Sequence, residues 1–221
     1  MKKLLSLKKW GILLFCMLPI FVFSQNITNY AFTTTTGASL ENMSTGSNLL
    51  IGSNSDDGVS SINAIGFDFW FMGTRYNQFS VNANGLIRLG PSIVDGPAAN
   101  ILGNSFNNPK ITAYWDDVST GNNGKVQYKI LGNAPNRKMV VEWQVTVPRN
   151  LLGATNAKYQ VWLHESTGVV EMVYDNVPEN ASGSYSVGIA SSITSFAAIN
   201  TTSHTCAYGT ADDAQTAAIS A

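Results

Sequence analysis

Residues 64–72 read Ala-Ile-Gly-Phe-Asp-Phe-Trp-Phe-Met, and this stretch decides the fold class. Its large apolar side chains recur at every second position, at Ile65, Phe67, Phe69 and Phe71. In an extended strand this spacing places them all on one face, while Asp68 and Trp70 point to the other. Four such side chains on one face need a second layer to cover them. The stretch therefore predicts a strand of a β-sandwich.

Turn residues follow this strand at short intervals. Gly73-Thr74 ends it, and a second strand is predicted over residues 76–82. Asn84-Gly85 comes next and is the strongest short signal for a β-hairpin. A third strand over residues 86–89 would complete a three-stranded meander.

The same alternation recurs along most of the remaining chain, and no stretch shows convincing helical periodicity. Further strands are predicted at 111–115, 125–131, 139–147, 158–165, 169–174 and 185–190, with weaker ones near Tyr30 and Phe196. Ser166-Thr167-Gly168 joins two of them in another hairpin. The longest predicted loop covers residues 91–110, and loops of that length are commonly functional or disordered. We expect an all-β fold, an antiparallel β-sandwich or jelly roll of about eleven strands.

The first 24 residues differ from the rest of the chain. Four lysines, at positions 2, 3, 8 and 9, precede an apolar run over residues 11–23, and Ser24 follows. This order is typical of a cleavable signal peptide, which we predict at residues 1–24. The apolar run is shorter than the about 20 residues that a membrane-spanning helix needs, so no permanent membrane anchor is expected. The sequence predicts a secreted or cell-surface protein.

Removal of residues 1–24 leaves 221 − 24 = 197 residues, which is enough for one sizeable domain. We expect this β-sandwich domain over residues 25–209 and a disordered or truncated end over residues 210–221. The four lysines leave with the signal peptide, so 13 − 4 = 9 basic residues face 14 acidic ones, a net charge of −5. An acidic surface argues against nucleic acid and anionic membranes as partners.

Several short phrases occur in an order that resembles a known kind of module. They are Asp56-Asp57-Gly58, Ile65-Gly66-Phe67-Asp68-Phe69, Gly73-Thr74-Arg75-Tyr76, residues 81–85, Ala113-Tyr114-Trp115-Asp116-Asp117, Ala134-Pro135-Asn136-Arg137 and residues 168–174. The chain resembles a secreted bacterial β-sandwich module of large cell-surface proteins that are associated with type IX secretion. The order of phrases is also similar to the extracellular nidogen-type (NIDO) domain. The resemblance implies a fold and an extracytoplasmic location, because its motifs are turns and core strands.

Signatures of catalysis are missing from the sequence. It has no Gly-x-Ser-x-Gly elbow, no His-Glu-x-x-His pair and no phosphate-binding glycine loop. His164 is adjacent to Glu165 on a predicted strand, so the two side chains would face opposite sides of the sheet. We therefore expect a protein that is not an enzyme. The alternative is a secreted carbohydrate-active enzyme of the glycoside hydrolase kind, with catalytic carboxylates from Glu142, Glu165, Glu171, Asp116 or Asp117.

Two acidic doublets are candidate ligands for Ca²⁺. Asp56-Asp57 lies in a polar loop, and Asp116-Asp117 follows a predicted strand. Calcium takes six to eight oxygen ligands in proteins, and loop carboxylates commonly supply them. Aspartate also caps turns through bonds from its side chain to the backbone. Both interpretations are open at this point.

Four aromatic residues are candidate ligand-binding residues: Trp70, Tyr114, Trp115 and Trp162. Trp70 and Trp162 are opposite in parity to the core faces of their strands, so they lie on a surface or beneath a second layer. Exposed tryptophans favour glycan or protein binding. The sequence thus predicts a non-catalytic extracellular module for adhesion or for binding a glycan or protein. A structural spacer within a larger surface protein is a further interpretation.

Overall fold

The computed structural model describes residues 26–97, 99–180, 183–209, 215 and 218–220. The predicted signal peptide, residues 1–24, lies outside the described residues, and so does most of the segment 210–221. In the parts of the chain that are described, no helical segment has the length and apolar character that a membrane crossing requires.

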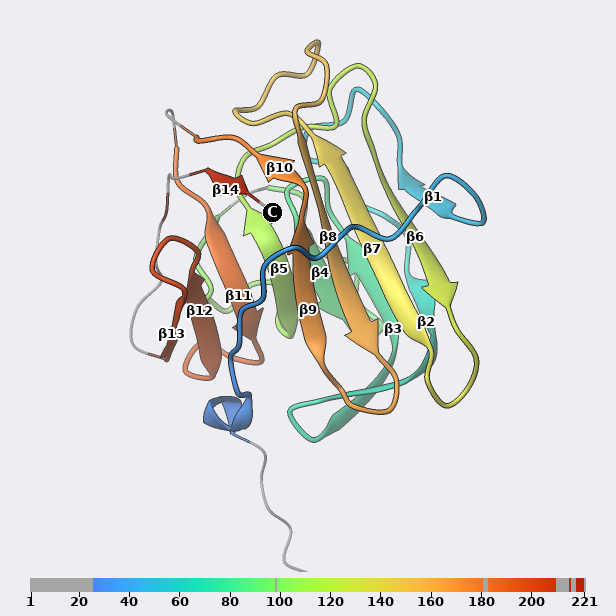
Figure 1. Cartoon of the computed structure of the whole chain (residues 1–221), viewed down its shortest axis with the longest axis vertical. Helices are drawn as coiled ribbons and strands as arrows, with labels where there is room; N and C mark the ends of the chain where they lie inside the picture. The colour runs from blue at the N-terminus through green and yellow to red at the C-terminus, as the bar shows by residue number, and fades with distance from the viewer. Residues whose placement is uncertain (1–25, 98, 181–182, 210–214, 216–217, 221) are drawn as a thin grey trace, which may run out of the picture.

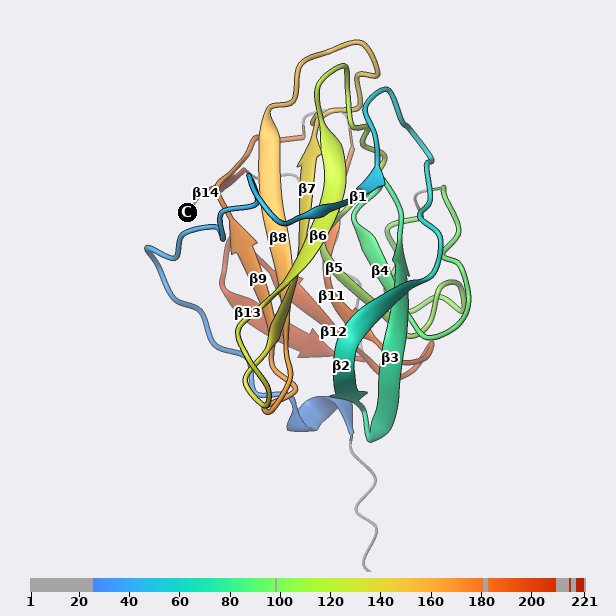
Figure 2. The same cartoon turned by 90° about the vertical axis from the view of Figure 1, so that its right-hand side faces the viewer.

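Two antiparallel sheets pack face to face (Figures 1 and 2). The first contains, in spatial order, β1 (Asn48–Ile51), β6 (Lys125–Leu131), β7 (Lys138–Val145), β8 (Ala157–His164) and β9 (Val170–Tyr174). The second contains, in spatial order, β13 (Thr205–Tyr208), β12 (Phe196–Asn200), β11 (Ser186–Ala190), β5 (Lys110–Trp115), β4 (Leu86–Leu89), β3 (Thr74–Val81) and β2 (Asn63–Phe71). A two-stranded ribbon joins β10 (Asn176–Val177) to β14 (Ile219–Ser220). The predicted antiparallel β-sandwich is confirmed, with more short strands than the about eleven expected.

The alternation on β2 is present as predicted. Its odd-numbered positions from Ile65 to Phe71 are buried between the sheets, whereas Trp70 on the opposite face is 54% exposed. The facing sheet contributes Trp143 of β7 and Tyr159 of β8, whose rings stack with centroids 5.6 Å apart. Burial of these large side chains is the main favourable contribution to the stability of the sandwich.

The predicted Asn84-Gly85 turn joins β3 to β4. Gly85 has a φ of +92°, a backbone conformation that residues with a Cβ rarely adopt. A Cβ atom at this position would lie only 1.8 Å from the carbonyl oxygen of Tyr114. Both the left-handed backbone and the close approach to β5 therefore require glycine here.

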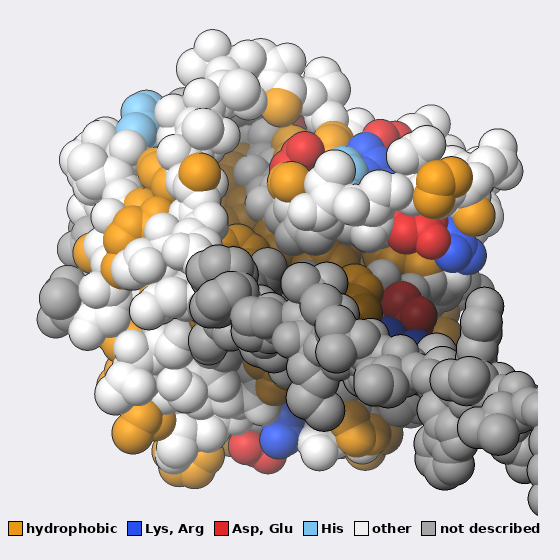
Figure 3. Space-filling view, turned by 90° about the horizontal axis from the view of Figure 1, so that it is seen from below, with side chains coloured by type: hydrophobic (Ala, Val, Ile, Leu, Met, Phe, Trp, Pro, Cys, Tyr) orange, Lys and Arg blue, Asp and Glu red, His pale blue; other side chains and the backbone are white. Residues whose placement is uncertain are grey.

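The weak strand predicted near Tyr30 is wrong. Residues Ile27–Asn29 form a short 3-10 helix, η1, whose first turn is capped by the side chain of Asn26. The phenol oxygen of Tyr30 accepts a hydrogen bond from the Met72 N–H at 3.0 Å, and the Tyr208 hydroxyl donates to the Tyr30 carbonyl at 2.7 Å. This segment closes the lower end of the sandwich instead of pairing with a sheet. Figure 3 shows the molecule from below, with hydrophobic and charged side chains interspersed among polar ones.

The long loop between β4 and β5 covers the outer face of the seven-stranded sheet. Leu102 is buried there in one cluster with Ala190, Phe196 and Ala198. The ammonium group of the buried Lys110 donates to Asn104 Oδ1 at 2.6 Å and to the Phe106 carbonyl at 3.0 Å. Ordered packing and these bonds give the loop a defined structure.

The predicted end segment, residues 210–221, is described only at four positions. Gln215 and Tyr185 exchange backbone hydrogen bonds of 2.9 and 3.0 Å. Ile219–Ser220 forms β14, which pairs with β10. Gln215, Ile219 and Ser220 therefore pair with other segments of the chain.

Candidate functional site

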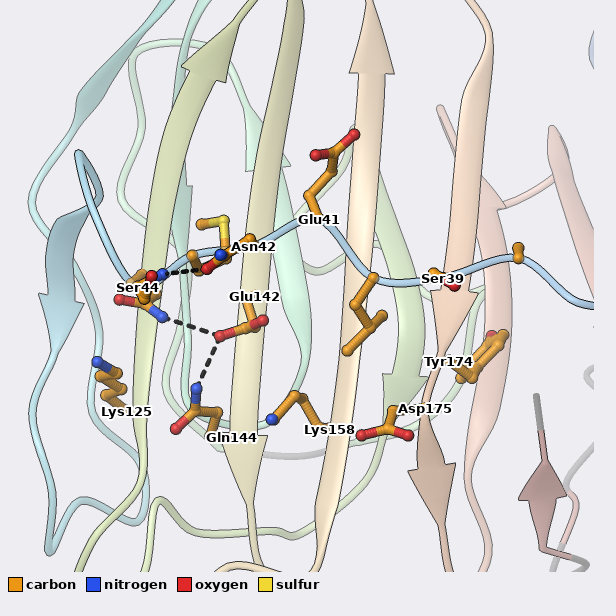
Figure 4. Close-up of a pocket in the computed structure, with 14 residues that line it drawn as sticks. Ser39, Glu41, Asn42, Ser44, Lys125, Glu142, Gln144, Lys158, Tyr174 and Asp175 are labelled. Carbon is orange, nitrogen blue, oxygen red and sulfur yellow. Dashed lines mark hydrogen bonds between the residues drawn. The ribbon is translucent and has the colours of Figure 1, made fainter.

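Residues 38–47, here called the strap, run across the outer face of the five-stranded sheet (Figures 1 and 4). Gln160 of β8 holds the backbone of the strap on both sides of Glu41. The Glu41 N–H donates to Gln160 Oε1, and Gln160 Nε2 donates to the Glu41 carbonyl, both at 2.9 Å. An ion pair of 2.7 Å between Lys138 and Glu41 adds a third attachment. The strap is thus fixed to the sheet by side chains and not by strand pairing.

Trp162 lies beneath the strap and is only 9% exposed. It is in one apolar cluster with Leu40 and Met43 of the strap. Its indole N–H donates to Gln160 Oε1 at 2.7 Å, and the Lys138 ammonium is 3.5 Å from the ring centroid. Trp162 therefore belongs to a second apolar layer, and its predicted use as a ligand-stacking surface is not supported by its position.

Glu142 of β7 is buried on the same outer face, next to the strap. Its Oε1 accepts hydrogen bonds from Gln127 Nε2 and Gln144 Nε2, and its Oε2 accepts one from Gln160 Nε2, each at 2.8 Å. Gln127, Glu142 and Gln160 are directly paired across β6, β7 and β8. The carboxylate is thus held by three amide donors that come from three adjacent strands.

A groove with a volume of about 630 Å³ opens beside the strap. Its floor carries a second polar row, in which Lys125, Gln144 and Lys158 are paired across β6, β7 and β8. Asp175 continues this row, because its N–H donates to the Lys158 carbonyl. Figure 4 shows the row on the opposite side of the strap from the Glu41 side chain. Within the described chain, the charged groups of Lys125, Lys158 and Asp175 form neither a hydrogen bond nor an ion pair.

The two acidic doublets are brought to the same end of the sandwich. Arg149 donates to Asp56 Oδ2 at 2.6 Å, and its Nε is 3.5 Å from Asp117 Oδ2. Asp57 accepts a hydrogen bond of 2.9 Å from Asn84. The guanidinium of Arg149 thus lies between the doublets and supplies the positive charge there.

Asp116 caps the turn that follows β5. Its Oδ1 accepts the N–H of Asp117 at 2.8 Å, and its Oδ2 accepts a hydrogen bond from Asn180. Burial raises the pKa of Asp116, and burial also raises the pKa of Asp117 against the opposing effect of Arg149. Within the described residues, no group of three or more His, Cys, Asp or Glu side chains is placed to hold a metal ion. The geometry therefore matches turn capping and ion pairing better than the oxygen shell of a calcium site.

Two further candidate aromatic residues, Tyr114 and Trp115, are buried. Tyr114 points into the core, where its ring stacks on Tyr185 with centroids 4.3 Å apart. Trp115 points to the outer face, where it is covered in one cluster with Leu86 and Val94. Trp70 alone among the four candidates is exposed to solvent, next to an ion pair of 3.1 Å between Asp68 and Arg75.

Two of the remaining candidate catalytic acids, Glu165 and Glu171, lie outside the groove, and each is next to a basic side chain. Glu165 accepts hydrogen bonds from Arg137, which hold the pKa of Glu165 below its ordinary value. Glu171 lies 3.3 Å from Nε2 of His164. Asp175 and Glu142 both line the groove, but they lie two strands apart and out of register.

Sequence reasoning missed the polar residues of the groove. They are Lys125, Gln127, Gln144 and Lys158, and sequence reasoning also missed Gln160, which holds the strap. A signal was present, because β6, β7 and β8 each carry two polar residues, two positions apart, on the face away from the core. Three neighbouring strands with this pattern indicate a continuous polar surface, which is recognisable only once their pairing is known.

Comparison with known proteins places the chain in a family. No curated protein and no solved structure matches the chain. The model of the family described as NIDO related matches residues 29–221, which include almost all of the described sandwich. The protein therefore belongs to the NIDO-related family.

Proposed function

We propose that this protein is a non-catalytic binding module of an exported cell-surface protein, which acts in adhesion. The groove beside the strap is its binding surface. The observation that carries the proposal is a row of charged and hydrogen-bonding side chains, open to solvent, whose lysines and aspartate have no partner within the described chain.

The groove suits a polar ligand. Lys125, Gln144 and Lys158 are only partly exposed, so a ligand that contacts them meets groups already shielded on several sides. The strap, which forms one wall, is held by the hydrogen bonds to Gln160 and by the ion pair of Glu41. A wall that is ordered before binding lowers the entropy cost of association.

The engagement of the candidate acids supports a role without catalysis. A glycosidase needs two carboxylates about 5 to 9.5 Å apart across a cleft, one of them free to transfer a proton. Glu142 accepts three amide hydrogen bonds, which favour its role as an organiser of the sheet surface. Glu165 is bound by Arg137 and lies outside the groove. Assays of polysaccharide hydrolysis are expected to show no turnover.

Whole-cell attachment and glycan-array binding test this function. The protein without residues 1–24 is compared with a groove variant, Gln144→Ala/Lys158→Ala, and with a control variant, Arg75→Ala/Gln78→Ala. The control residues lie on β3 in the opposite sheet. We expect attachment by the wild type and the control and a clear loss in the groove variant. Absence of any binding by the wild type, or an equal loss in both variants, contradicts the proposal.

A further inference from the structure

The outer face of the five-stranded sheet already holds one extended peptide, which is its own strap. The backbone of the strap is bound across the strands by the side-chain amide of Gln160, which contacts both the N–H and the carbonyl of Glu41. Lys129 donates to the carbonyl of Asn42 in the same way. The face therefore binds an extended chain through polar side chains that reach up from the strands.

The open row on the groove floor runs parallel to these residues, two positions away along each strand. Lys125 stands in place of Gln127, and Lys158 stands in place of Gln160. Gln144 lies between the two lysines and gives one amide hydrogen bond to Glu142, which leaves its side-chain oxygen available as an acceptor. The row thus offers donors at both lysines and an amide between them, in line with the strap.

The two lysines of this row favour an acidic ligand, while the lining also contains three carboxylates, those of Glu41, Glu142 and Asp175. Glu41 points to the other side of the strap and pairs with Lys138 (Figure 4). The carboxylate of Glu142 accepts three amide hydrogen bonds. No acidic group of the described chain lies within ion-pair distance of Lys125 or Lys158. Their positive charges are therefore available to a ligand in a partly shielded place, where an ion pair is screened less than on an open surface.

We propose that this row binds an extended acidic segment of a partner protein, which lies beside the strap and across β6, β7 and β8. This inference rests on the proposed function and names the class of its ligand. The backbones of Lys125 and Lys158 are two strands apart, a distance of about 10 Å. In an extended peptide, two acidic residues are about 7 Å apart when they are two positions apart and about 13 Å apart when they are four positions apart, so the spacing of the lysines lies between these values. Flexible lysine side chains bridge this difference. Asp175 lies next to Lys158 at the β9 end of the row, and its charge weakens the attraction of an acidic group there.

An acidic peptide explains the lining of the groove better than a glycan does. Sugar rings commonly stack on exposed aromatic faces, and Tyr174 is the aromatic residue that contributes to this lining. Its hydroxyl donates to the Ala113 carbonyl at 2.8 Å, so the side chain is directed into the core. Trp162 is covered by the strap. The polar groups of the lining are lysine, amide, hydroxyl and carboxylate side chains, which can form hydrogen bonds to a peptide backbone, and the two lysines can also bind carboxylates.

Fluorescence anisotropy with a labelled peptide of four Glu-Ser repeats tests the inference. A peptide of four Lys-Ser repeats is the control probe. The protein variants are Lys125→Gln/Lys158→Gln in the groove and Arg75→Gln/Arg88→Gln on the opposite sheet, so both lose two positive charges. We expect wild-type binding of the acidic peptide that weakens with added salt, an about tenfold or greater loss in the groove variant and no comparable loss in the control. Thermal melting verifies that both variants are folded.

Two results overturn the inference: no binding of the acidic peptide by the wild type, or an equal loss in both variants. If the wild type instead binds cells or a neutral glycan and the groove variant Gln144→Ala/Lys158→Ala loses that binding, the ligand is not an acidic peptide although the proposed function stands. If no ligand binds in either set of experiments, the proposed function fails as well.

Discussion

Replacement of Glu142 is the most informative perturbation of this protein, because one carboxylate joins three strands. In Glu142→Ala the amides of Gln127, Gln144 and Gln160 each lose one acceptor, while Gln160 Nε2 keeps its bond to the Glu41 carbonyl. A buried donor without a partner costs about 1–3 kcal/mol. Gln144 is partly exposed and turns to water, whereas Gln127 and Gln160 are buried. The two buried N–H donors left without an acceptor and the small cavity together lower the free energy of unfolding by about 3–5 kcal/mol.

The conservative variant Glu142→Gln separates charge from shape. The oxygen of the new amide still accepts hydrogen bonds. Its NH₂ group, however, faces either the donor of Gln160 or, in the flipped orientation, the donors of Gln127 and Gln144. Gln160 cannot rotate its amide freely, because its oxygen accepts from both the Glu41 N–H and the Trp162 indole. We expect an intermediate loss of about 1–2 kcal/mol.

Urea denaturation and calorimetry measure these losses. For a domain of this size each kcal/mol lowers the Tm by about 2–4 °C, so Glu142→Ala is expected to melt about 6–20 °C below the wild type. Glu171→Ala is the matched control, since its side chain is 44% exposed and is paired with His164, and its loss is about 1 kcal/mol or less. The reasoning is refuted if Glu142→Ala melts with the control, or if Glu142→Gln costs as much as Glu142→Ala.

Three further predictions follow from other parts of the sandwich. Gly85→Ala places a Cβ atom 1.8 Å from the Tyr114 carbonyl oxygen, so we expect the variant not to fold. The expected readouts are the absence of soluble protein and the loss of near-UV circular dichroism. A melting curve like that of the wild type would show that the turn can move. Burial lowers the pKa of His164 below 6.5, and Glu171 has a smaller opposing effect on this pKa. The unfolded state therefore binds more protons than the folded state, and the free energy of unfolding falls as the pH drops below 6.5. His164→Gln is expected to flatten this part of the profile in urea titrations between about pH 5 and 7.5, and an unchanged slope would contradict the assignment. In the protein without residues 1–24, Trp70→Ala changes stability by about 0.5 kcal/mol or less and removes most of the acrylamide-quenchable fluorescence, because Trp70 is the exposed one among the described tryptophans. Undiminished quenching would place another tryptophan at the surface.

The core strands and hairpins were predictable because their signals are local. Alternation from Ile65 to Phe71 depends only on the period of a strand, and Gly85 is required by the geometry of one turn. The wrong strand near Tyr30 also follows from using local signals alone. The hydrogen bonds that fix Tyr30 come from Met72 and Tyr208, which are distant in sequence.

The covering layers were not predictable from periodicity. Trp162 and Trp115 both have the parity of outward-facing residues, and each is buried by a segment without regular structure. Such segments leave no repeating pattern to indicate which face they cover. The acidic doublets show the same limit, because nothing in the sequence indicates that Arg149 lies between Asp56 and Asp117.

The attachment of the strap has a consequence for how this scaffold can change. The strap contributes one wall of the groove, but it gives no strand to the sheet beneath. Exchange of exposed strap residues such as Ser39 and Asn42 therefore reshapes the groove and leaves the pairing of β6, β7 and β8 intact. A separate wall of this kind allows selectivity to be varied, by natural sequence drift or by design, without loss of the folded framework.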